Sequence, residues 1–401
     1  MRILMLNYHA KSGGASVAMN RIAEGLEEAG MTVKIASLNG TTTRSVGLPG
    51  AVARRIRLSR RMESLVLRLG GVTGAADRSF NLWRTGIGDW VRNLDFDVVH
   101  LHWICRGMVS WQDLSEIGKP LVWTFHDGWA IGDGRFYPFS EMDAYSIPSD
   151  RAQLLRMASR RFARRRARCL EKVKPVVVTP SKWLASEVER FGRFKEAARC
   201  IHNPLDRFWD ASRAVKEAVS TRRWVVGASG FDVDPRKGGF LLLQAIRKMQ
   251  AEGRFPEDVQ LALFGGGGVD TRGLPNGIRW LGSLSHEQIR NVFEESELFI
   301  CPSLIDNFPN MIAEAQSCGC PVLATPVGGV PEMVERGASG ELSLSASAES
   351  IEAAMLQWES EWRFQYRKNA VKAFAKKRYD VAESVRLHQE AYEMAGRDGR
   401  A

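Results

Sequence analysis

Two carboxylates eight positions apart, Asp306 and Glu314, are the residues of this chain whose types and spacing most strongly suggest chemistry. The apolar run at 297–303 is typical of a buried strand, and 311–317 is typical of a helix ended by the glycine and proline that follow. A loop that enters a helix exposes unpaired backbone N–H groups, which can hold phosphate or polarised hydroxyls. Glu314, about one turn into the helix, could accept hydrogen bonds from a ribose diol. The alternative is a helix cap with an acid in a surface turn.

Several other motifs with polar or glycine residues directly follow predicted strands. Ligands of open parallel sheets bind beyond the carboxyl ends of the strands. The candidate catalytic residues are His126, Asp306 and Glu314. The predicted substrate-binding residues are Gly13, Gly14, Asp127, Arg236, Lys237, Gly265, Ser283, Leu284, Asn307, Phe308, Pro309, Asn310 and Met311.

The physical case for these residues differs in strength. Arg236 and Lys237 beside a glycine suit a diphosphate clamp, although a solvated charged turn is the alternative. A histidine directly after a strand, as His126 is, is more often functional than one on an apolar face. Asp127 could orient that imidazole or cap a turn. The Gly13 pair could let backbone approach a phosphate or acceptor, but an ordinary turn is equally consistent.

The order of the motifs resembles that of the family-four glycosyltransferases, retaining enzymes with two Rossmann-like domains that face a cleft (the GT-B fold). Residues 306–314 are similar to the Glu-x7-Glu signature of that family, with Asp306 in place of the usual first Glu. The Asp-Asn-Phe-Pro-Asn form resembles members that act in bacterial exopolysaccharide and colanic-acid-type assembly. The motifs that carry the resemblance lie at 13–15, 98–103, 124–129, 178–183, 201–204, 234–238 and 264–268.

The resemblance implies transfer of a hexose from a nucleotide-diphosphate sugar to an acceptor hydroxyl, with retention and without a metal or other cofactor. It places the nucleotide in the C-terminal domain and the acceptor, a glycan or lipid-linked glycan, in the N-terminal domain. His126 would face the donor sugar. Lys237 matches the family pattern well. In many members the clamp arginine sits several residues earlier, where this chain has Phe231, so the role of Arg236 is open.

Strand and helix patterns alternate along the chain in two series. The expected strands lie at 3–6, 33–37, 98–102, 121–125 and 176–179, and then at 224–228, 259–264, 278–280, 298–301 and 322–325. Two such series predict an α/β fold with two doubly wound parallel sheets. The expected domains are 1–205 and 206–378, with a helix at 379–401 that, by resemblance, crosses back to the first domain.

Composition fits an ordinary globular protein of two domains. The chain has 401 residues, and this length exceeds what one core usually supports. Its residues are 44% hydrophobic and 25% charged, as in ordinary globular proteins. No apolar run approaches the roughly 20 residues of a membrane helix. The six scattered cysteines predict buried free thiols in a reducing cytoplasm, so a cytoplasmic location is expected.

The basic residues are concentrated in the N-terminal half. Residues 1–205 hold 32 Lys and Arg against 19 Asp and Glu, a net charge of +13, whereas the whole chain is +10. This predicts an anionic partner for the first domain. Residues 52–69 combine an apolar stripe (Val52, Ile56, Met62, Leu65, Val66 and Leu69) with arginines, and 151–168 contains eight arginines and no acid. Both suit attachment to the inner face of an anionic membrane, the alternative being that the stripes pack on the core.

Three further interpretations fit parts of the sequence. His100 and His102 alternate on a strand as metal ligands can, but no third ligand presents itself, so a packed pair is expected. A nucleotide-sugar enzyme without transfer, such as a 2-epimerase, shares the fold. A polyanion-binding protein is a weaker alternative, and the chain has no aromatic-interleaved basic sheet or finger motif, so nucleic acid is not an expected partner. The sequence does not indicate the oligomeric state.

Overall fold

The chain folds into two compact units. The computed structural model describes residues 1–71, 78–137, 152–194, 196–210, 222–227, 234–266, 274–275 and 277–398. Unit 1 comprises Met1–Pro204 together with Val381–Ala401, and unit 2 comprises Leu205–Asp380. Each unit has its own sheet and its own apolar core.

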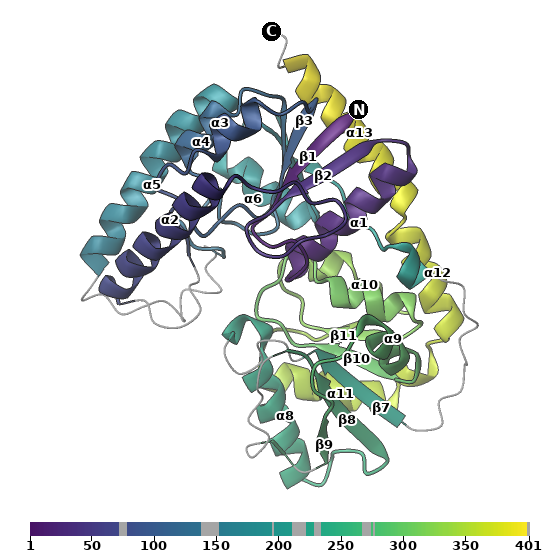
Figure 1. Cartoon of the computed structure of the whole chain (residues 1–401). Helices are drawn as coiled ribbons and strands as arrows, with labels where there is room; N and C mark the ends of the chain where they lie inside the picture. Colours follow the sequence, from purple (N-terminus) through teal and green to yellow (C-terminus); the bar gives the residue numbers. More distant parts are fainter. Residues whose placement is uncertain are drawn as a thin grey trace. The chain divides into compact units, whose positions relative to one another are not determined.

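Unit 1 is built on a parallel sheet of six strands in the order β2-β1-β3-β4-β5-β6. Figure 1 labels three of them, β1, β2 and β3. Strands β3, β4 and β5 are buried at every residue, as strands covered on both faces by helices must be. The strands are β1 (Arg2–Leu6), β2 (Thr32–Ala36), β3 (Val98–Leu101), β4 (Leu121–Thr124), β5 (Val176–Thr179) and β6 (Arg199–Cys200). The helices are α1 (Gly14–Glu28), α2 (Gly50–Leu69), α3 (Ile87–Arg92), α4 (Trp111–Glu116), α5 (Ala152–Val173), α6 (Lys182–Phe191) and α13 (Val381–Asp398).

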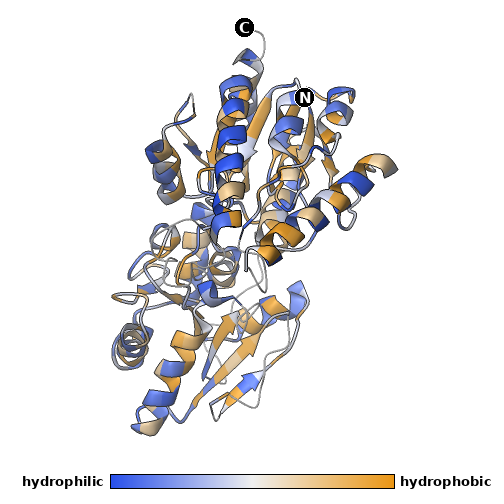
Figure 2. Ribbon diagram, turned by 90° about the vertical axis from the view of Figure 1, so that its left-hand side faces the viewer, coloured by the Kyte–Doolittle hydropathy of each residue, from blue (hydrophilic) through white to orange (hydrophobic). Residues whose placement is uncertain are grey.

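Unit 2 contains a second parallel sheet, in the order β12-β11-β10-β7-β8-β9. The strands are β7 (Arg222–Gly227), β8 (Val259–Phe264), β9 (Ile278–Trp280), β10 (Leu298–Cys301), β11 (Val322–Ala324) and β12 (Gly340–Leu342). The helices are α7 (Arg207–Asp210), α8 (Gly239–Ala251), α9 (His286–Glu294), α10 (Asn310–Ser317), α11 (Ala348–Ser360) and α12 (Lys368–Arg378), with the 3-10 helix η3 (Pro235–Lys237) after β7. Figure 2 shows the strands of both sheets as mainly hydrophobic and the helices as mixed.

The strand order of each sheet reverses once, and this reversal positions the sites. In unit 1 the chain leaves β1 towards β2 and returns on the other side at β3; in unit 2 it leaves β7 towards β8 and returns at β10. At such a reversal the two flanking connections diverge and open a crevice beyond the carboxyl ends of the strands, which is where open α/β sheets bind ligands.

The predicted fold class of two doubly wound parallel sheets is confirmed. Four strands, β5, β8, β9 and β10, have the bounds expected from the sequence. Two edge strands, β6 and β12, were missed because they are only two and three residues long and lack an apolar run.

The last helix, α13, belongs to unit 1. Gly25 of α1 has no side chain, and a Cβ there would lie 2.7 Å from a methyl group of Val381 and 2.8 Å from one of Val385. At the other end of α13, Glu390 accepts a hydrogen bond of 2.6 Å from Arg199 of β6. The helix therefore closes one face of the first sheet.

Helix α2 has two apolar faces. Val52 and Ile56 are buried in the core of unit 1, whereas Met62, Leu65 and Leu69 are 38%, 57% and 60% exposed. The expectation of a single apolar stripe at 52–69 is therefore wrong. One set of apolar residues faces the core, and the other lies on the surface.

Helix α5 packs on the core beside α2 (Figure 1). Leu155, Ala158 and Phe162 are buried. Arg166 is buried too: it donates to the carbonyl oxygen of Ala130, and its guanidinium lies 5.2 Å from the centre of the Phe162 ring. Burial lowers the pKa of Arg166 to about 10. The buried apolar residues of this segment therefore pack on the core of unit 1, which is one of the two alternatives stated above. Arg151 lies outside the described residues.

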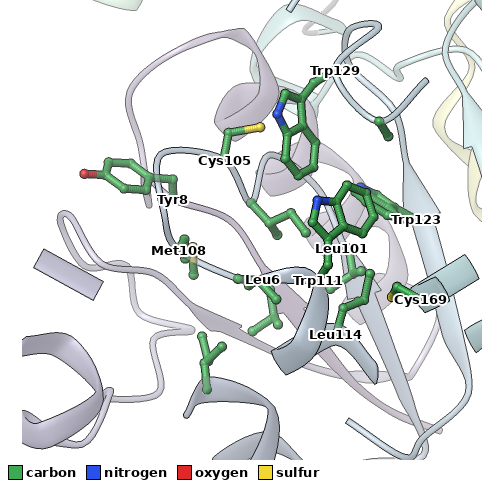
Figure 3. Packing of buried hydrophobic residues seen from close by; sticks show 14 of the residues in the cluster. Leu6, Tyr8, Leu101, Cys105, Met108, Trp111, Leu114, Trp123, Trp129 and Cys169 are labelled. Atoms are coloured by element: carbon green, nitrogen blue, oxygen red, sulfur yellow. The ribbon is translucent and has the colours of Figure 1, made fainter. Parts of the chain in front are cut away.

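The core of unit 1 is rich in tryptophan (Figure 3). Trp111 and Trp129 stack with ring centres 5.2 Å apart, and Trp123 lies 5.9 Å from Trp111. Trp129 Nε1 donates to the carbonyl oxygen of Ser79 over 2.7 Å, which satisfies its polar atom in the core. These rings pack the connections that follow β3 and β4 onto the core of unit 1.

In the part of the chain that the structure describes, no helix is both long and apolar enough to span a bilayer. All six cysteines are free, and five are buried, as expected. Burial raises the pKa of the Cys301 thiol to about 11, which makes it unreactive as a nucleophile.

Candidate active site

Lys237 and Asp306 form an ion pair at the strand-order reversal of unit 2. Lys237 ends the connection after β7, and Asp306 lies in the connection after β10. The ammonium is 2.8 Å from the carboxylate, and the Asp306 side chain is largely buried. The negative charge of Asp306 raises the pKa of Lys237, so the lysine is charged at neutral pH. The structure thus brings together two predicted site residues that lie 69 positions apart.

The backbone holds these two loops in close contact. Gly238 has a φ of +66°, and a Cβ there would lie 1.7 Å from the carbonyl oxygen of Pro302. Leu304 donates its N–H to the carbonyl oxygen of Arg236 over 2.7 Å. No other residue type fits at Gly238, because both the φ value and the approach of the next loop exclude a side chain.

The Arg236 side chain is engaged within its own loop. Its Nε and Nη2 atoms lie 2.9 and 2.6 Å from the two carboxylate oxygens of Asp234, in a bidentate pair. Asp234 also accepts the N–H of Arg236 and so caps η3. Asp234 therefore acts as a turn residue.

The segment 307–311 leads from the Asp306 loop into α10. Asn307 is buried, and Phe308 packs edge-on against Tyr379 with ring centres 6.0 Å apart. Pro309 occupies the cap position, and no side chain caps the first turn of α10, which begins at Asn310. The Met311 side chain lies over Gly227 at the end of β7, where an added Cβ would be 2.1 Å from the methionine methyl group.

Glu314 lies in the second turn of α10 and is 9% exposed. A helix start without a side-chain cap thus lies one turn before a carboxylate. This is the arrangement that the sequence predicted for holding a phosphate and a diol.

Three further predicted residues lie together after β8 and β9. Gly265 donates its N–H to the carbonyl oxygen of Gly282 over 2.9 Å, and the Ser283 hydroxyl donates to the carbonyl oxygen of Gly265 over 3.2 Å. Leu284 packs against the core of unit 2. Gly267 and Gly268 of the glycine run lie outside the described residues.

In unit 1, the glycine pair begins α1. Gly13 has a φ of +90°, is exposed, and has nothing within 4 Å of where a Cβ would be. Gly14 is the first residue of the helix, which has no side-chain cap. Ser16 donates to the carbonyl oxygens of His9 and Ser12 over 2.9 and 2.8 Å, which holds the loop before the helix in place.

His126 is joined to a second histidine. Its Nε2 lies 3.0 Å from Nδ1 of His102, and the two rings are stacked. Burial lowers the pKa of His126 to about 4 and the pKa of His102 well below the ordinary value, so both rings are neutral at pH 7. A bond between two imidazole nitrogens needs one protonated nitrogen and one bare nitrogen.

The surroundings of His102 indicate which nitrogen carries the proton. Its Nε2 is buried and has no hydrogen-bond partner among the described residues. An orphaned buried N–H is rarer than an orphaned acceptor. This favours the tautomer in which His102 Nδ1 donates to His126 Nε2, leaving the His126 proton on Nδ1.

The histidine cluster extends to α13. His100 is hydrogen-bonded to the hydroxyls of Tyr392 and Thr124, each at 2.8 Å, and its ring centre lies 4.2 Å from that of His102 and 5.6 Å from that of His388. The expected packed pair is confirmed, and His126 and His388 lie beside it. Among the described residues, these histidines do not form a group that could hold a metal ion. His102 Nδ1 and His126 Nε2 are bonded to each other, so these two nitrogens do not together present lone pairs to a metal.

Asp127 has a supporting role in this structure. One carboxylate oxygen accepts from Nε1 of Trp103 over 3.0 Å, and the other accepts the N–H of Trp129 over 2.9 Å. The carboxylate therefore caps its own turn and holds the indole that follows His102.

The residues around Trp103 were not predicted from the sequence. His9 and Arg106 both lie within 6.4 Å of its ring. Only their positions after β1 and β3 could have indicated them, because no motif contains them.

Comparison with known proteins places these features in a family. A model described as "Glycosyltransferase Family 4" matches residues 12–207, and one described as "Glycosyl transferases group 1" matches residues 222–360. Together they cover both units, including the His126 turn and the Lys237–Asp306 pair. The chain belongs to the family-four glycosyltransferases.

Relatives of known function are distant. The D-inositol 3-phosphate glycosyltransferase of Mycolicibacterium smegmatis is 27% identical over 263 residues, or 62% of this chain and 56% of the relative. One component of the human phosphatidylinositol N-acetylglucosaminyltransferase is 38% identical over 85 residues, 21% of this chain and 18% of that protein. The match thus spans little more than half the length of the first relative.

Solved structures share the fold along nearly the whole chain. Anabaena HepE in complex with UDP-glucose has a TM-score of 0.62 at 17% identity, covering 98% of this chain and 100% of HepE. Sucrose-phosphate synthase from Thermosynechococcus elongatus has a TM-score of 0.64 at 14% identity, covering 98% of each chain. The fold of this family-four member is therefore the GT-B fold.

Proposed function

We propose that the chain transfers a sugar from a nucleoside-diphosphate sugar to an acceptor hydroxyl, with retention of the anomeric configuration. The observation that carries the proposal is the Lys237–Asp306 pair at the strand-order reversal of unit 2, beside the start of α10. Family membership and the UDP-glucose bound in HepE support a nucleotide-sugar donor.

In this proposal the donor diphosphate takes the place of Asp306 beside Lys237. The ammonium then opposes the charge that develops on the leaving diphosphate as the sugar bond breaks, together with backbone N–H groups at the start of α10. Asp306, released from the lysine, accepts hydrogen bonds from sugar hydroxyls. Arg236 assists only if its pair with Asp234 opens. Because cations supply this stabilisation, we expect turnover to persist in a chelator without added metal.

Glu314 and His126 act on other parts of the donor. Glu314 accepts hydrogen bonds from the ribose diol. His126 is neutral because burial lowers its pKa, so it contributes a hydrogen bond from Nδ1 to the donor sugar rather than a positive charge. Retention follows, in the resembled family, from departure and attack on the same face of the sugar.

We propose that the acceptor is a cell-surface glycan or lipid-linked glycan presented at an anionic membrane. The net charge of +13 in residues 1–205 and the exposed apolar face of α2 support this. The inositol-lipid enzyme among the relatives is compatible with it.

A thermal-shift screen with a panel of nucleotide sugars identifies the donor, because a ligand of the folded state raises apparent stability. In the decisive test, Glu314→Ala weakens binding of that donor by about 1.5–3 kcal/mol, the range for hydrogen bonds to a charged group. Glu287→Ala, at an exposed carboxylate of α9, serves as the matched control and binds like the wild type.

Two outcomes count against the proposal. Unchanged donor binding by Glu314→Ala removes the ribose assignment. Donor turnover at the same rate with and without acceptor indicates a nucleotide-sugar enzyme that does not transfer, such as an epimerase.

A further inference from the structure

Three basic side chains gather at the strand-order reversal of unit 1, and none has a role in the proposed donor site. His9 follows β1, Arg106 follows β3, and Arg60 comes from α2. The reversal between β1 and β3 is the place where the unit 1 sheet is expected to bind a ligand.

Two aromatic rings hold the three side chains near one another. The Arg106 guanidinium lies 5.4 Å from the ring centre of Trp103, and the His9 ring lies nearly parallel to it at 6.4 Å. Tyr8 lies 4.8 Å from His9 and 5.9 Å from Trp103, and its hydroxyl accepts a hydrogen bond of 2.9 Å from Arg60. In Figure 3 the Tyr8 hydroxyl points away from the tryptophans of the core.

Over the described residues, no carboxylate forms an ion pair with Arg60 or Arg106. Among those residues, Arg106 makes no side-chain hydrogen bond or ion pair, and the bond that Arg60 makes is to a neutral phenol. The nearby acid Glu63 is buried and bonded to Ser79 and to the N–H groups of Phe80 and Asn81.

The pKa of His9 is consistent with positive charge gathered around its ring. Partial burial, and then the charges of Arg106 and Arg60, lower the pKa of His9. A bound anion would offset the charges of both arginines and provide them with hydrogen-bond acceptors.

The backbone fixes Arg106 in an uncommon conformation. Its φ is +56°, in the left-handed region that costs a non-glycine residue free energy. Its N–H donates to the Ser79 hydroxyl over 2.8 Å, and the next N–H, of Gly107, donates to Asn81 over 2.7 Å. A Cβ at Gly107 would lie 2.6 Å from the Ser59 hydroxyl. The loop is thus held by its surroundings in a form that presents Arg106 beside Trp103.

The cluster adjoins the proposed reaction centre. Trp103 directly follows His102, whose Nδ1 is bonded to His126, and its indole N–H is bonded to Asp127. A group bound beside Trp103 would therefore lie near the turn that carries His126.

We propose that Arg60, Arg106 and His9 form a subsite for a phosphate or diphosphate group of the acceptor. The inference rests on the proposed function and adds the chemical class of the second substrate: a phosphorylated acceptor. Arginine forks match phosphate oxygens in pairs, and over the described residues neither of the two arginines is bonded to a carboxylate.

The test is calorimetric titration of the full chain with inorganic pyrophosphate, in the presence of saturating UDP so that the donor site is filled. We expect Arg106→Gln and Arg60→Gln each to weaken pyrophosphate binding about tenfold or more, since each removes a charge-assisted contact. Arg106→Lys keeps the charge and most of the binding. Arg57→Gln is the matched control, because it is an exposed arginine of the same helix, and it binds pyrophosphate like the wild type.

Equal pyrophosphate binding by Arg106→Gln, Arg60→Gln and Arg57→Gln, or none by the wild type, overturns the subsite. The dissociation constant of UDP, measured separately, reports on the donor site alone, and an unchanged thermal unfolding transition of unit 1 shows that each variant is folded. Failure of the wild type to bind UDP would count against the proposed function, not against this inference.

A second arm separates an acceptor phosphate from lipid headgroups. Phosphatidylcholine vesicles with and without phosphatidylglycerol are the probe. We expect Arg106→Gln to leave vesicle binding unchanged, because Arg106 is partly buried beside Trp103. Loss of vesicle binding in Arg106→Gln with unchanged pyrophosphate binding would assign the arginine to headgroups and overturn the proposal.

Discussion

At the scale of single residues, the His102–His126 hydrogen bond and the Lys237–Asp306 ion pair hold the proposed reacting groups in defined states before any substrate binds. The first fixes a neutral ring and favours one tautomer. The second keeps a cation in place with a counter-ion that a diphosphate can replace. Such preorganisation lets a site stabilise developing charge without rearranging when the reaction occurs.

We predict that His126→Ala lowers turnover by about 100-fold or more, the cost of removing one positioned donor at a reacting centre. The dissociation constant of UDP should stay within a factor of about two, because His126 lies in unit 1 and the nucleotide is assigned to unit 2. Steady-state kinetics and UDP titration measure the two effects, with His286→Ala of α9 as control. A matching loss of UDP affinity would move His126 out of the reaction centre.

Sequence could indicate these residues only where they follow a strand directly. His126 comes after β4 of unit 1, whereas Lys237 and Asp306 come after β7 and β10, which are neighbouring strands of unit 2. The general location of each residue therefore followed from the fold of its own unit. The pairing of Lys237 with Asp306 could not be predicted, because it depends on the close approach of two loops at Gly238. Arg106 could not be predicted either, since its left-handed backbone is imposed by hydrogen bonds from the segment at 79–81.

At the scale of elements, α2 shows the limit of reading a helix from its apolar positions. The helical period of 3.6 residues shows that apolar residues recur along the helix. It does not show whether they form one apolar face or two. In the structure Ile56 packs inward, while Leu58, Leu65 and Leu69 are 57% to 60% exposed. Buried strands were easier to predict from the sequence, because runs such as Val176–Thr179 of β5 are apolar at every position except the last.

The exposed face of α2 leads to a prediction about membranes. The face carries Leu65 and Leu69, with exposed arginines at 54, 57 and 61. We expect the chain to co-sediment with anionic vesicles. A variant with glutamate at all three arginine positions should lose most binding at low salt, since each cation near an anionic surface contributes about 1 kcal/mol.

The apolar part of that attachment has its own test. Leu65→Ser with Leu69→Ser should lose the fraction of binding that survives high salt, because salt screens charge but not apolar contact. Phe364→Ser, at an equally exposed apolar residue of unit 2, is the control. Equal sedimentation of all variants, or none with anionic vesicles, would make α2 an ordinary solvated helix and the acceptor a soluble one.

At the scale of the whole molecule, each sheet places its chemically active side chains at its own reversal of strand order. In unit 1 these are His9 and Arg106, beside His126; in unit 2 they are Lys237 and Asp306. In our proposals the same architecture serves two different groups of ligands, and the difference lies in the loops. The location of a site at each reversal was expected from the fold, whereas the chemical class of each ligand depends on loop contacts that the sequence does not reveal.

The two units should also respond differently to acid. His100, His102, His126 and His388 are all buried in unit 1, and burial holds each of their pKa values below the ordinary value. The unfolded chain therefore binds more protons than the native one below about pH 6.5, so the stability of unit 1 falls as pH falls from that point towards 4. Each histidine that is protonated in the unfolded chain and neutral in the native one changes the free energy of unfolding by up to about 1.4 kcal/mol per pH unit. Glu63, whose pKa burial raises, works in the opposite direction but is a single group.

Differential scanning calorimetry between pH 7 and pH 5 measures this. We expect the unfolding transition of unit 1 to shift to lower temperature with acid and to be insensitive to UDP. UDP should raise the midpoint temperature of the unit 2 transition. His388→Gln removes one buried imidazole outside the proposed reaction centre, so the shift per pH unit of the acid-sensitive transition should become smaller whatever the change in stability at pH 7. An unchanged pH dependence in that variant, or a greater acid shift in the UDP-sensitive transition, would show that the buried histidines do not set the acid stability of unit 1.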